Sequence, residues 1–383
     1  INGGTGDDDF TGGAGHDTFN GNAGDDTYTA GAGGHDTFNV TLGTDTIIGL
    51  NNGDILVVSN GATAIATITS FDATFATRND GAATLTAKST GGVIDLENAT
   101  VGTGTYTIKV GAGTDTITGS KGDDIIEVVA TTQGNADTLD GGLGDDTLKL
   151  SGGSHTFSDN NKLKNIENFS LSTSTSTVNF TGQLEALTLT GGSAVDNITG
   201  GNAADIISGA ANDDILAGGI GDDIISGGDG ADTITGGANN DSLTGGAGND
   251  TFNIDSGTDI ITDLTTGDIV VISNGASLNV TGITGFVATN ASSNANASAT
   301  SANLTAASGT VTIDMSDSTG KYTITGGSGD NTLKAGKQDS VVKGESGNDI
   351  IVGDAGADTL TGGAGNDTFT GNAGNDTFNI DSG

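Results

Sequence analysis

The sequence contains no cysteine, no proline and no tryptophan, and only 4% of its 383 residues are aromatic. The absence of cysteine excludes disulfide bridges as staples of the fold, so bound metal ions would have to take their place. No apolar run approaches the roughly 20 residues that a membrane-spanning helix needs. We therefore expect no transmembrane segment.

Basic residues are also scarce, with 11 Lys and Arg against 49 Asp and Glu, which gives a net charge of −38. This charge excludes nucleic acid as a partner, because the phosphate backbone would be repelled, and it disfavours an anionic membrane surface. Cations are the natural partners of such a chain. The three histidines, His16, His35 and His155, are scattered, and we expect them to be exposed residues rather than ligands or catalysts.

Glycine is abundant, with 68 residues, and much of it belongs to a nine-residue repeat. Residues 191–262 are eight consecutive copies: GGSAVDNIT, GGNAADIIS, GAANDDILA, GGIGDDIIS, GGDGADTIT, GGANNDSLT, GGAGNDTFN and IDSGTDIIT. The sixth place is always Asp and the eighth is always a large apolar residue. Small residues at the first four places predict a turn, and the last three places alternate like a short strand with one side chain inward.

Two repeats make one coil of a solenoid, about 18 residues long, and coils stack roughly 4.8 Å apart like paired strands. Aspartates two repeats apart then lie above one another, and two bare carboxylates at that distance repel by roughly 3 kcal/mol at an effective dielectric constant of about 20. A hard divalent cation with six to eight oxygen ligands fits between carboxylates and turn carbonyls, and this describes calcium better than magnesium.

The apolar side of the repeat is too thin to fold the chain unaided. Burying one Ile or Leu in each nonapeptide contributes about 1.5–3 kcal/mol. Fixing nine backbone residues costs on the order of 9 kcal/mol or more. We therefore expect metal binding and folding to be one event.

At these residues the chain resembles the repeats-in-toxin (RTX) family, whose consensus is G-G-x-G-x-D-x-U-x. GGIGDDIIS and GGAGNDTFN match every fixed place, whereas Ala194 and Ala203 replace the fourth-place Gly. The resemblance implies a right-handed parallel β-roll, binding of several calcium ions, export by one-step (type I) secretion from a Gram-negative-type bacterium, and folding outside the cell on meeting calcium.

The sixth-place acids are the predicted calcium ligands. They are Asp8, Asp17, Asp26, Asp36, Asp115, Asp124, Asp146, Asp196, Asp205, Asp214, Asp223, Asp232, Asp241, Asp250, Asp259, Asp349, Asp358, Asp367 and Asp376. Asp137 is a possible further member, and Asn331 and Ser340 stand where two repeats lack the Asp.

The chain divides into seven segments by the presence or absence of the nonapeptide. Repeat blocks are expected at 1–39, 110–149, 191–262 and 326–383, a β-coil connection at 150–190, and β-rich inserts at 40–109 and 263–325. The inserts either continue the solenoid or pack as a small sandwich. They resemble each other, since GTDTIIGLNNGDILVVSNGA at 43–62 corresponds to GTDIITDLTTGDIVVISNGA at 257–276. Both ends of the sequence lie inside a repeat, so we expect a window of a longer protein.

No motif for catalysis is present: there is no H-E-x-x-H, no G-x-S-x-G and no Cys nucleophile. Nearly all acids share one phase of the repeat, which a calcium ladder explains better than a catalytic pair, so we expect no enzyme and no catalytic residue. An ice-binding solenoid would need regular outward Thr or Asn rows, yet the third place is Thr only at Thr5.

Two function classes then remain. The first is a calcium-dependent extracellular structural protein of a bacterial surface, such as an S-layer, a filament or an adhesin stalk, with self-association into a filament or lattice. Repetition at two scales favours this class. The alternative is the C-terminal RTX region of a type I-secreted toxin or hydrolase whose catalytic domain lies outside these residues.

Overall fold

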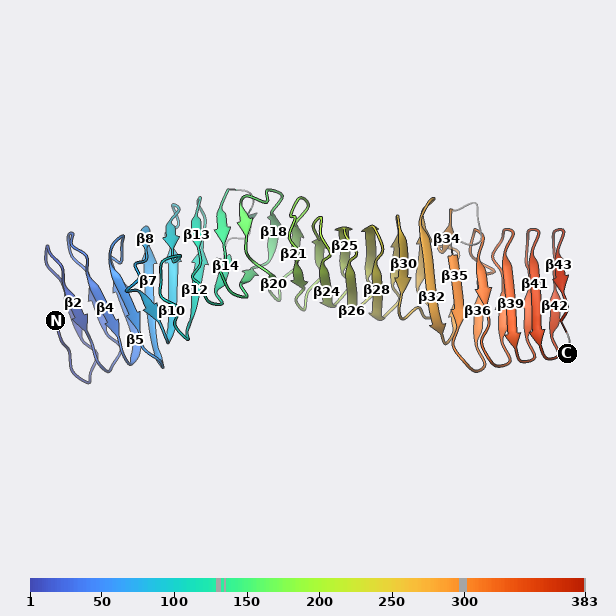
Figure 1. The fold of residues 1–383 in the computed structure, drawn as a ribbon, viewed down its shortest axis with the longest axis horizontal. Helices are drawn as coiled ribbons and strands as arrows, with labels where there is room; N and C mark the ends of the chain where they lie inside the picture. Colours follow the sequence, from blue (N-terminus) through green and yellow to red (C-terminus); the bar gives the residue numbers. More distant parts are fainter. Residues whose placement is uncertain (129–131, 134–135, 296–301, 382–383) are drawn as a thin grey trace. The chain divides into compact units, whose positions relative to one another are not determined.

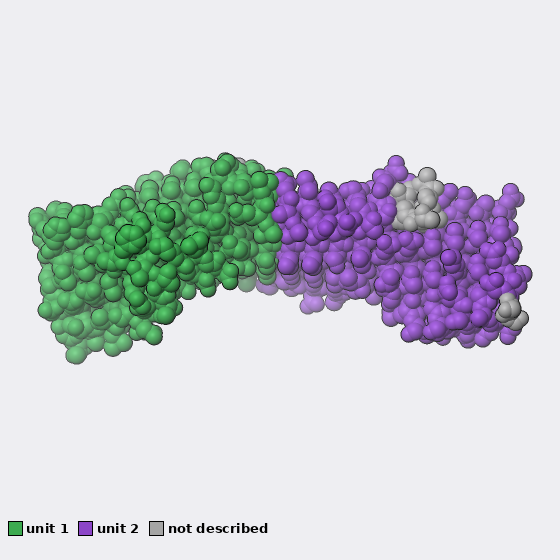
Figure 2. Space-filling model, viewed as in Figure 1, with its two compact units in different colours: residues 1–190 green, residues 191–383 purple. Residues whose placement is uncertain are grey.

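The computed structural model describes residues 1–128, 132–133, 136–295 and 302–381, and no helix is present among them. It divides into two compact units, residues 1–190 and residues 191–383 (Figure 2). In each unit short strands lie side by side, one coil after the next (Figure 1). Each ladder pairing described below is parallel, so each unit is a parallel β-solenoid, as the repeat predicts.

In unit 1 one continuous ladder runs through every coil. Its strands are β1 (Asp9–Thr11), β3 (Thr27–Thr29), β5 (Gly43–Ile48), β7 (Ala62–Ile68), β10 (Ala82–Ala87), β12 (Thr105–Val110), β14 (Ile125–Val128), β17 (Thr147–Leu150), β20 (Asn168–Leu171) and β22 (Thr188–Thr190).

The returning strands of unit 1 form three shorter ladders. The first is β2 (Thr18–Asn20), β4 (Thr37–Val40), β6 (Ile55–Val58) and β9 (Arg78–Asn79). The second is β8 (Ser70–Asp72), β11 (Val93–Asp95), β13 (Thr116–Thr118), β16 (Thr138–Asp140) and β19 (Leu163–Lys164). The third is β15 (Thr132–Gln133), β18 (Gly153–Thr156) and β21 (Ser176–Asn179).

Unit 2 has the same organisation. Its continuous ladder is β24 (Ile206–Ala211), β26 (Ile224–Asp229), β28 (Ser242–Ala247), β30 (Thr258–Ile261), β32 (Ser277–Ile283), β35 (Ala302–Ala306), β37 (Thr323–Thr325), β39 (Val341–Ser346), β41 (Thr359–Ala364) and β43 (Thr377–Asn379). The returning strands are β23 (Asp196–Thr199), β25 (Ile215–Ile220), β27 (Thr233–Ala238), β29 (Thr251–Ile254), β31 (Ile269–Ile272) and β34 (Ser293–Asn294), then β33 (Phe286–Val287), β36 (Thr312–Asp314), β38 (Thr332–Lys334), β40 (Ile350–Val352) and β42 (Thr368–Thr370).

The inserts continue the solenoid, so of the two alternatives left open by the sequence the sandwich is wrong. Their coils are longer than the 18-residue coils of the repeat blocks. Ile225 lies opposite Leu243, 18 residues later, whereas Leu85 lies opposite Ile108, 23 residues later. The nine-residue period disappears from the inserts because the turns lengthen, not because the fold changes.

The core is a column of inward side chains, with one large apolar side chain from many strands of the repeat blocks and several apolar side chains from strands such as β7 and β32. Ile225 and Leu243 are completely buried, and Phe19 and Phe38 stack with ring centroids 5.1 Å apart. The prediction of three exposed histidines holds for His16 and His35 but is wrong for His155, which is 1% exposed. Strand alternation in β18 turns its ring inward, where burial lowers its pKa.

Candidate metal sites

The sixth-place aspartates lie beneath the turns and are bonded from coil to coil. Asp223 Oδ1 accepts the backbone N–H of Asp205 at 2.7 Å, and Asp241 Oδ1 accepts the backbone N–H of Asp223 at 2.9 Å. Each carboxylate therefore holds the turn of the preceding coil in place. We call a stack of such aspartates an acidic row.

Every predicted ligand belongs to an acidic row, and the sequence analysis also missed some members. The bonded pairs, with the N–H donor first, are Asp8 and Asp26, Asp26 and Asp45, Asp17 and Asp36, Asp36 and Asp54, Asp115 and Asp137, Asp124 and Asp146, Asp196 and Asp214, Asp214 and Asp232, Asp232 and Asp250, Asp250 and Asp268, Asp205 and Asp223, Asp223 and Asp241, Asp241 and Asp259, Asp349 and Asp367, and Asp358 and Asp376.

The second oxygen of many of these carboxylates is buried and has no hydrogen-bond partner among the described residues. This holds for Oδ2 of Asp26, Asp115, Asp146, Asp214, Asp223, Asp232, Asp241, Asp259, Asp349 and Asp358. A buried carboxylate oxygen without a partner is costly, since it has lost its water and gained nothing. The atoms around each Oδ2 indicate which ligand would offset this cost.

That environment is made of glycine and backbone oxygen. A methyl group on Gly218 would lie 2.1 Å from Asp223 Oδ2, so a side chain at the first place of this repeat would displace the carboxylate. Gly219 and Gly221 have φ of 110° and 141°, and methyl groups there would lie 2.3 Å from the carbonyl oxygens of Gly201 and Ala203. The turns thus bring the carbonyls of one coil against the next. Carboxylate and carbonyl oxygens are the donors that calcium prefers.

The raised pKa values of the row aspartates also indicate that a cation would stabilise the rows. Burial, with neighbouring carboxylates adding to it, raises the pKa of Asp223, Asp259 and Asp146 to about 7. Burial likewise raises the pKa of Asp214 and Asp250 to about 6. At neutral pH a folded metal-free row therefore carries charge that it stabilises poorly, and a bound cation would reverse this.

Acidic side chains alone do not complete a site. Within the described ranges no group of three or more His, Cys, Asp or Glu side chains could hold a metal ion. The six to eight oxygens that calcium takes would have to come from row carboxylates together with backbone carbonyls of the turns. The glycine-lined turns provide carbonyls in this position, so the residues present fit calcium.

Comparison with protein families agrees with this geometry. The model of the RTX calcium-binding nonapeptide repeat matches residues 2–34, 102–128, 131–154, 190–225, 226–261, 325–360 and 352–383, together more than half of the chain. The chain belongs to this RTX family. Its repeats bind several calcium ions, and proteins of the family are typically secreted. No curated protein matches the chain. In the part of the chain that the structure describes, no helix is long and apolar enough to cross a membrane.

The RTX rows extend into the inserts, beyond the matched residues. Asp45, Asp54 and Asp268 are buried, and each is the next member of its row after Asp26, Asp36 and Asp250, respectively. The sequence signal was present, because Asp54 and Asp268 each follow a glycine and lie 18 residues after a row member. It was missed because the apolar place after them belongs to a longer strand pattern.

The fourth place of the RTX turn is left-handed in most coils. Asn212 and Asn239 replace glycine there and have φ of 75° and 89°, a region that asparagine tolerates. In the two consecutive repeats with Ala194 and Ala203, the Oδ2 atoms of Asp196 and Asp205 accept the N–H of Gly192 and Gly201 at 2.8 and 2.6 Å.

A second set of side chains, at the fifth place, bonds in the opposite direction. Asp213 Oδ1 accepts the N–H of Ala231 at 2.8 Å, and Asp222 Oδ1 accepts the N–H of Asn240 at 3.0 Å, one coil later in each case. These fifth-place residues are exposed. An RTX turn with Asp at the fifth place, such as that of Asp222 and Asp223, therefore has side-chain hydrogen bonds to both neighbouring coils. The sequence analysis did not assign this role to the fifth place.

Proposed function

We propose that the chain is a calcium-dependent extracellular structural protein of a bacterial surface, of the kind that forms an S-layer, a filament or an adhesin stalk. The observation that supports this most directly is the continuity of the ladder. Each of the two units keeps one parallel ladder through repeat blocks and inserts alike, and in the described residues no element of another fold interrupts it. Such a chain extends and stiffens.

Calcium supplies the free energy that the thin core lacks. The members of the acidic rows, both the predicted aspartates and Asp45, Asp54 and Asp268, are the proposed side-chain ligands, with turn carbonyls completing each site. Binding neutralises the rows and makes folding and metal uptake one event. In calcium-poor cytoplasm the acidic repeat blocks stay unfolded, which suits one-step secretion.

Higher-order assembly follows through contacts between the sides or ends of solenoids. Apart from Asp229 at the end of β26, the strand residues that face outward in residues 206–262 are uncharged, as in the row Ile206, Ile224 and Ser242, and the other acids lie at the turns. Two copies of such an anionic solenoid unit therefore repel least where their strand faces meet. A repeat region that served only the export of a toxin or hydrolase would not need such association.

The test is circular dichroism with electron microscopy of EGTA-treated protein before and after adding millimolar calcium. We expect a coil spectrum to convert to β structure and ordered filaments or sheets to appear. Folding without association would favour the adhesin stalk or the toxin or hydrolase appendage. A spectrum that calcium does not change would contradict the calcium-dependent part of the proposal.

A further inference from the structure

We propose that unit 1 binds a neutral oligosaccharide along the carboxyl ends of strands β8, β11, β13, β16 and β19. Two neighbouring hollows lie there. One, of about 450 Å³, is lined by Glu97, Lys121, Asp140 and Asn165 among others. The other, of about 260 Å³, includes Phe75. We call the two hollows together the unit 1 groove.

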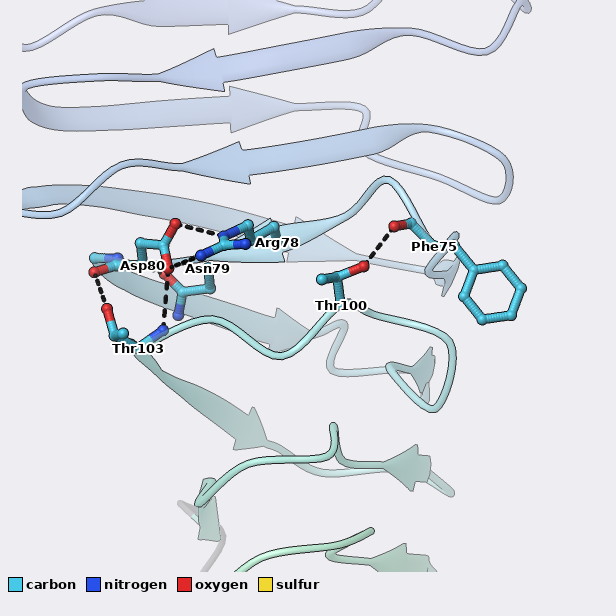
Figure 3. Close-up of polar contacts among 7 residues, drawn as sticks. Phe75, Arg78, Asn79, Asp80, Thr100 and Thr103 are labelled. Carbon is cyan, nitrogen blue, oxygen red and sulfur yellow. Dashed lines mark hydrogen bonds and ion pairs between the residues drawn. The ribbon is translucent and has the colours of Figure 1, made fainter.

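Phe75 is an aromatic surface that the solenoid does not use for its own packing. Its side chain is 74% exposed and projects away from the strands (Figure 3). Its backbone is anchored, because Thr100 Oγ1 donates to the Phe75 carbonyl at 2.5 Å. Lys121 Nζ lies 5.6 Å from the ring centroid and joins the ring to the larger hollow. An anchored, exposed ring beside polar groups is a stacking platform for an apolar face of a ligand.

The turn that carries Phe75 is held rigidly on its other side. Arg78 pairs with Asp80 through two hydrogen bonds of 2.6 and 2.9 Å, and Asp80 Oδ1 also accepts the N–H of Thr103 at 3.1 Å (Figure 3). Arg78 is the single arginine of the sequence. The platform is therefore preorganised, which reduces the entropy lost when a ligand binds.

Polar side chains continue from this platform at the pitch of the coils. The strand register places Asp72, Asp95, Thr118, Asp140 and Lys164 one above another, one per coil. At about 4.8 Å per coil the row spans roughly 19 Å, and one coil spacing is close to the length of one pyranose unit in an extended chain.

The chemistry of this row suits hydroxyl groups. Asp140 Oδ1 accepts the Asn165 side-chain N–H at 2.7 Å, and Asp95 Oδ1 accepts the Glu97 N–H at 3.0 Å, so both carboxylates are oriented. Carboxylates accept from sugar hydroxyls, while Lys and Asn donate to them. The net charge of −38 repels an anionic polysaccharide, so a neutral one is favoured.

The corresponding place in unit 2 has a different surface, although the inserts are similar. Asn290 stands where the first insert has Phe75, since ITGF at 283 corresponds to ITSF at 68. The register row there is Val287, Asp314, Lys334 and Val352, and Lys334 Nζ pairs with Asp314 at 2.6 Å. The insert fold alone therefore does not produce the unit 1 groove; the side chains of unit 1 do.

This inference rests on the proposed function, because one wall of the groove is an RTX turn. Ser120 and Lys121 line the groove and belong to the turn whose row member is Asp124, and Ser120 N–H donates to Asp124 Oδ2 at 2.5 Å. Calcium at this turn would order the wall. We expect saccharide binding to appear only after calcium has folded unit 1.

The experiment is isothermal titration calorimetry of the calcium-loaded chain with cellohexaose, maltohexaose, N-acetylchitohexaose and, as the anionic arm, hexagalacturonate. We expect at least one neutral hexamer to bind and Phe75→Ala to weaken it by about tenfold or more. Thr118→Lys, which copies Lys334 of unit 2, should weaken it too. The matched control Asn290→Ala should leave binding unchanged, and circular dichroism must find every variant folded.

Three outcomes would each contradict the groove proposal: no neutral hexamer binds, Phe75→Ala binds as tightly as wild type, or hexagalacturonate binds more tightly than the neutral hexamers.

Different outcomes would contradict the proposed function. If the chain folds with calcium but binds no sugar, only the groove is wrong. If the chain is already folded in EGTA and binds sugar there, the calcium-dependent function is wrong and the groove stands.

Discussion

Residues 191–262 and residues 263–325 of unit 2 build the same parallel solenoid with different turns. In the first region the N–H of each turn donates to a buried carboxylate, as Asp205 does to Asp223. In the second, Val270 N–H donates to Ser292 Oγ at 3.2 Å, and Ser292 O accepts from Ser318 Oγ at 2.9 Å. The comparison separates two roles of the row: the fold needs an acceptor at this place, but it does not need a charge.

Two positions in the last repeat block also show that the row needs a hydrogen-bond acceptor and not a charge. Asn331 Oδ1 accepts the Val311 N–H at 3.1 Å, and Ser340 Oγ accepts the Tyr322 N–H at 3.3 Å, so neutral side chains replace the aspartate within a row. The insert also buries more apolar side chains on a strand, as β32 does with Leu278, Val280 and Ile283. Most members of the charged rows thus lie in the repeat blocks, where the core is thinnest and a cation contributes most.

The largest effect is expected from pH: in the absence of calcium, protonation of the row carboxylates should stabilise the fold. Because the folded-state pKa of Asp223 and Asp259 is raised to about 7, above the value near 4 of an unfolded carboxyl, protonation favours the folded state. The metal-free solenoid is therefore most stable below about pH 4 and loses this stability as pH rises through about 7. Circular dichroism in EGTA should find β structure increasing from pH 8 to pH 4.

Calcium affinity should move in the opposite direction and fall as pH decreases through about 7 to 6, because protons compete for the same oxygens. A calcium-binding electrode titration at several pH values measures this. An affinity that is independent of pH between 8 and 5 would be incompatible with ligands of raised pKa.

A smaller effect is expected at a single row position. Comparing Asp223→Ala with Asp223→Asn distinguishes the contribution of the hydrogen bond from that of the carboxylate charge. The alanine leaves the Asp205 N–H without its acceptor and should cost about 1–3 kcal/mol in the calcium-bound state. The asparagine keeps an acceptor, as Asn331 does, so it should lower calcium affinity while stabilising the metal-free state relative to wild type. Thermal unfolding with and without calcium measures both.

Ser292→Ala is the matched control in the insert. It removes the acceptor of the Val270 N–H and should destabilise the chain by about 1 kcal/mol with or without calcium. Equal calcium dependence of Ser292→Ala and Asp223→Ala would remove the distinction between the two regions.

The smallest effect is expected from glycine at the first place. Gly218→Ala puts a methyl group 2.1 Å from Asp223 Oδ2, so the carboxylate must move and calcium affinity should fall about threefold to tenfold. Gly13→Ala, at the second place of another turn, meets no atom within 4 Å and serves as the control. Calcium titrations measure the affinity of both variants. Equal calcium affinities of Gly218→Ala and Gly13→Ala would contradict this prediction.

The nonapeptide was sufficient to predict the parallel solenoid and the place of most row members in the repeat blocks, because glycine, aspartate and one apolar residue recur there at a fixed period. It could not predict that the inserts keep the solenoid, since turns of variable length hide the period while the strands still pair. Asp45, Asp54 and Asp268 were missed because they lie in the inserts, where the apolar place after the Asp belongs to a longer strand pattern. The inward ring of His155 was missed because polarity was weighted above strand alternation.

Hydrogen exchange with mass spectrometry, followed as calcium is removed, tests most directly that the rows need calcium and the inserts do not. With calcium, amides of residues 206–261 and of residues 269–283 should both be protected. In EGTA at neutral pH, residues 206–261 should exchange rapidly while residues 269–283 keep their protection. Persistent protection of residues 206–261 without calcium would contradict the account.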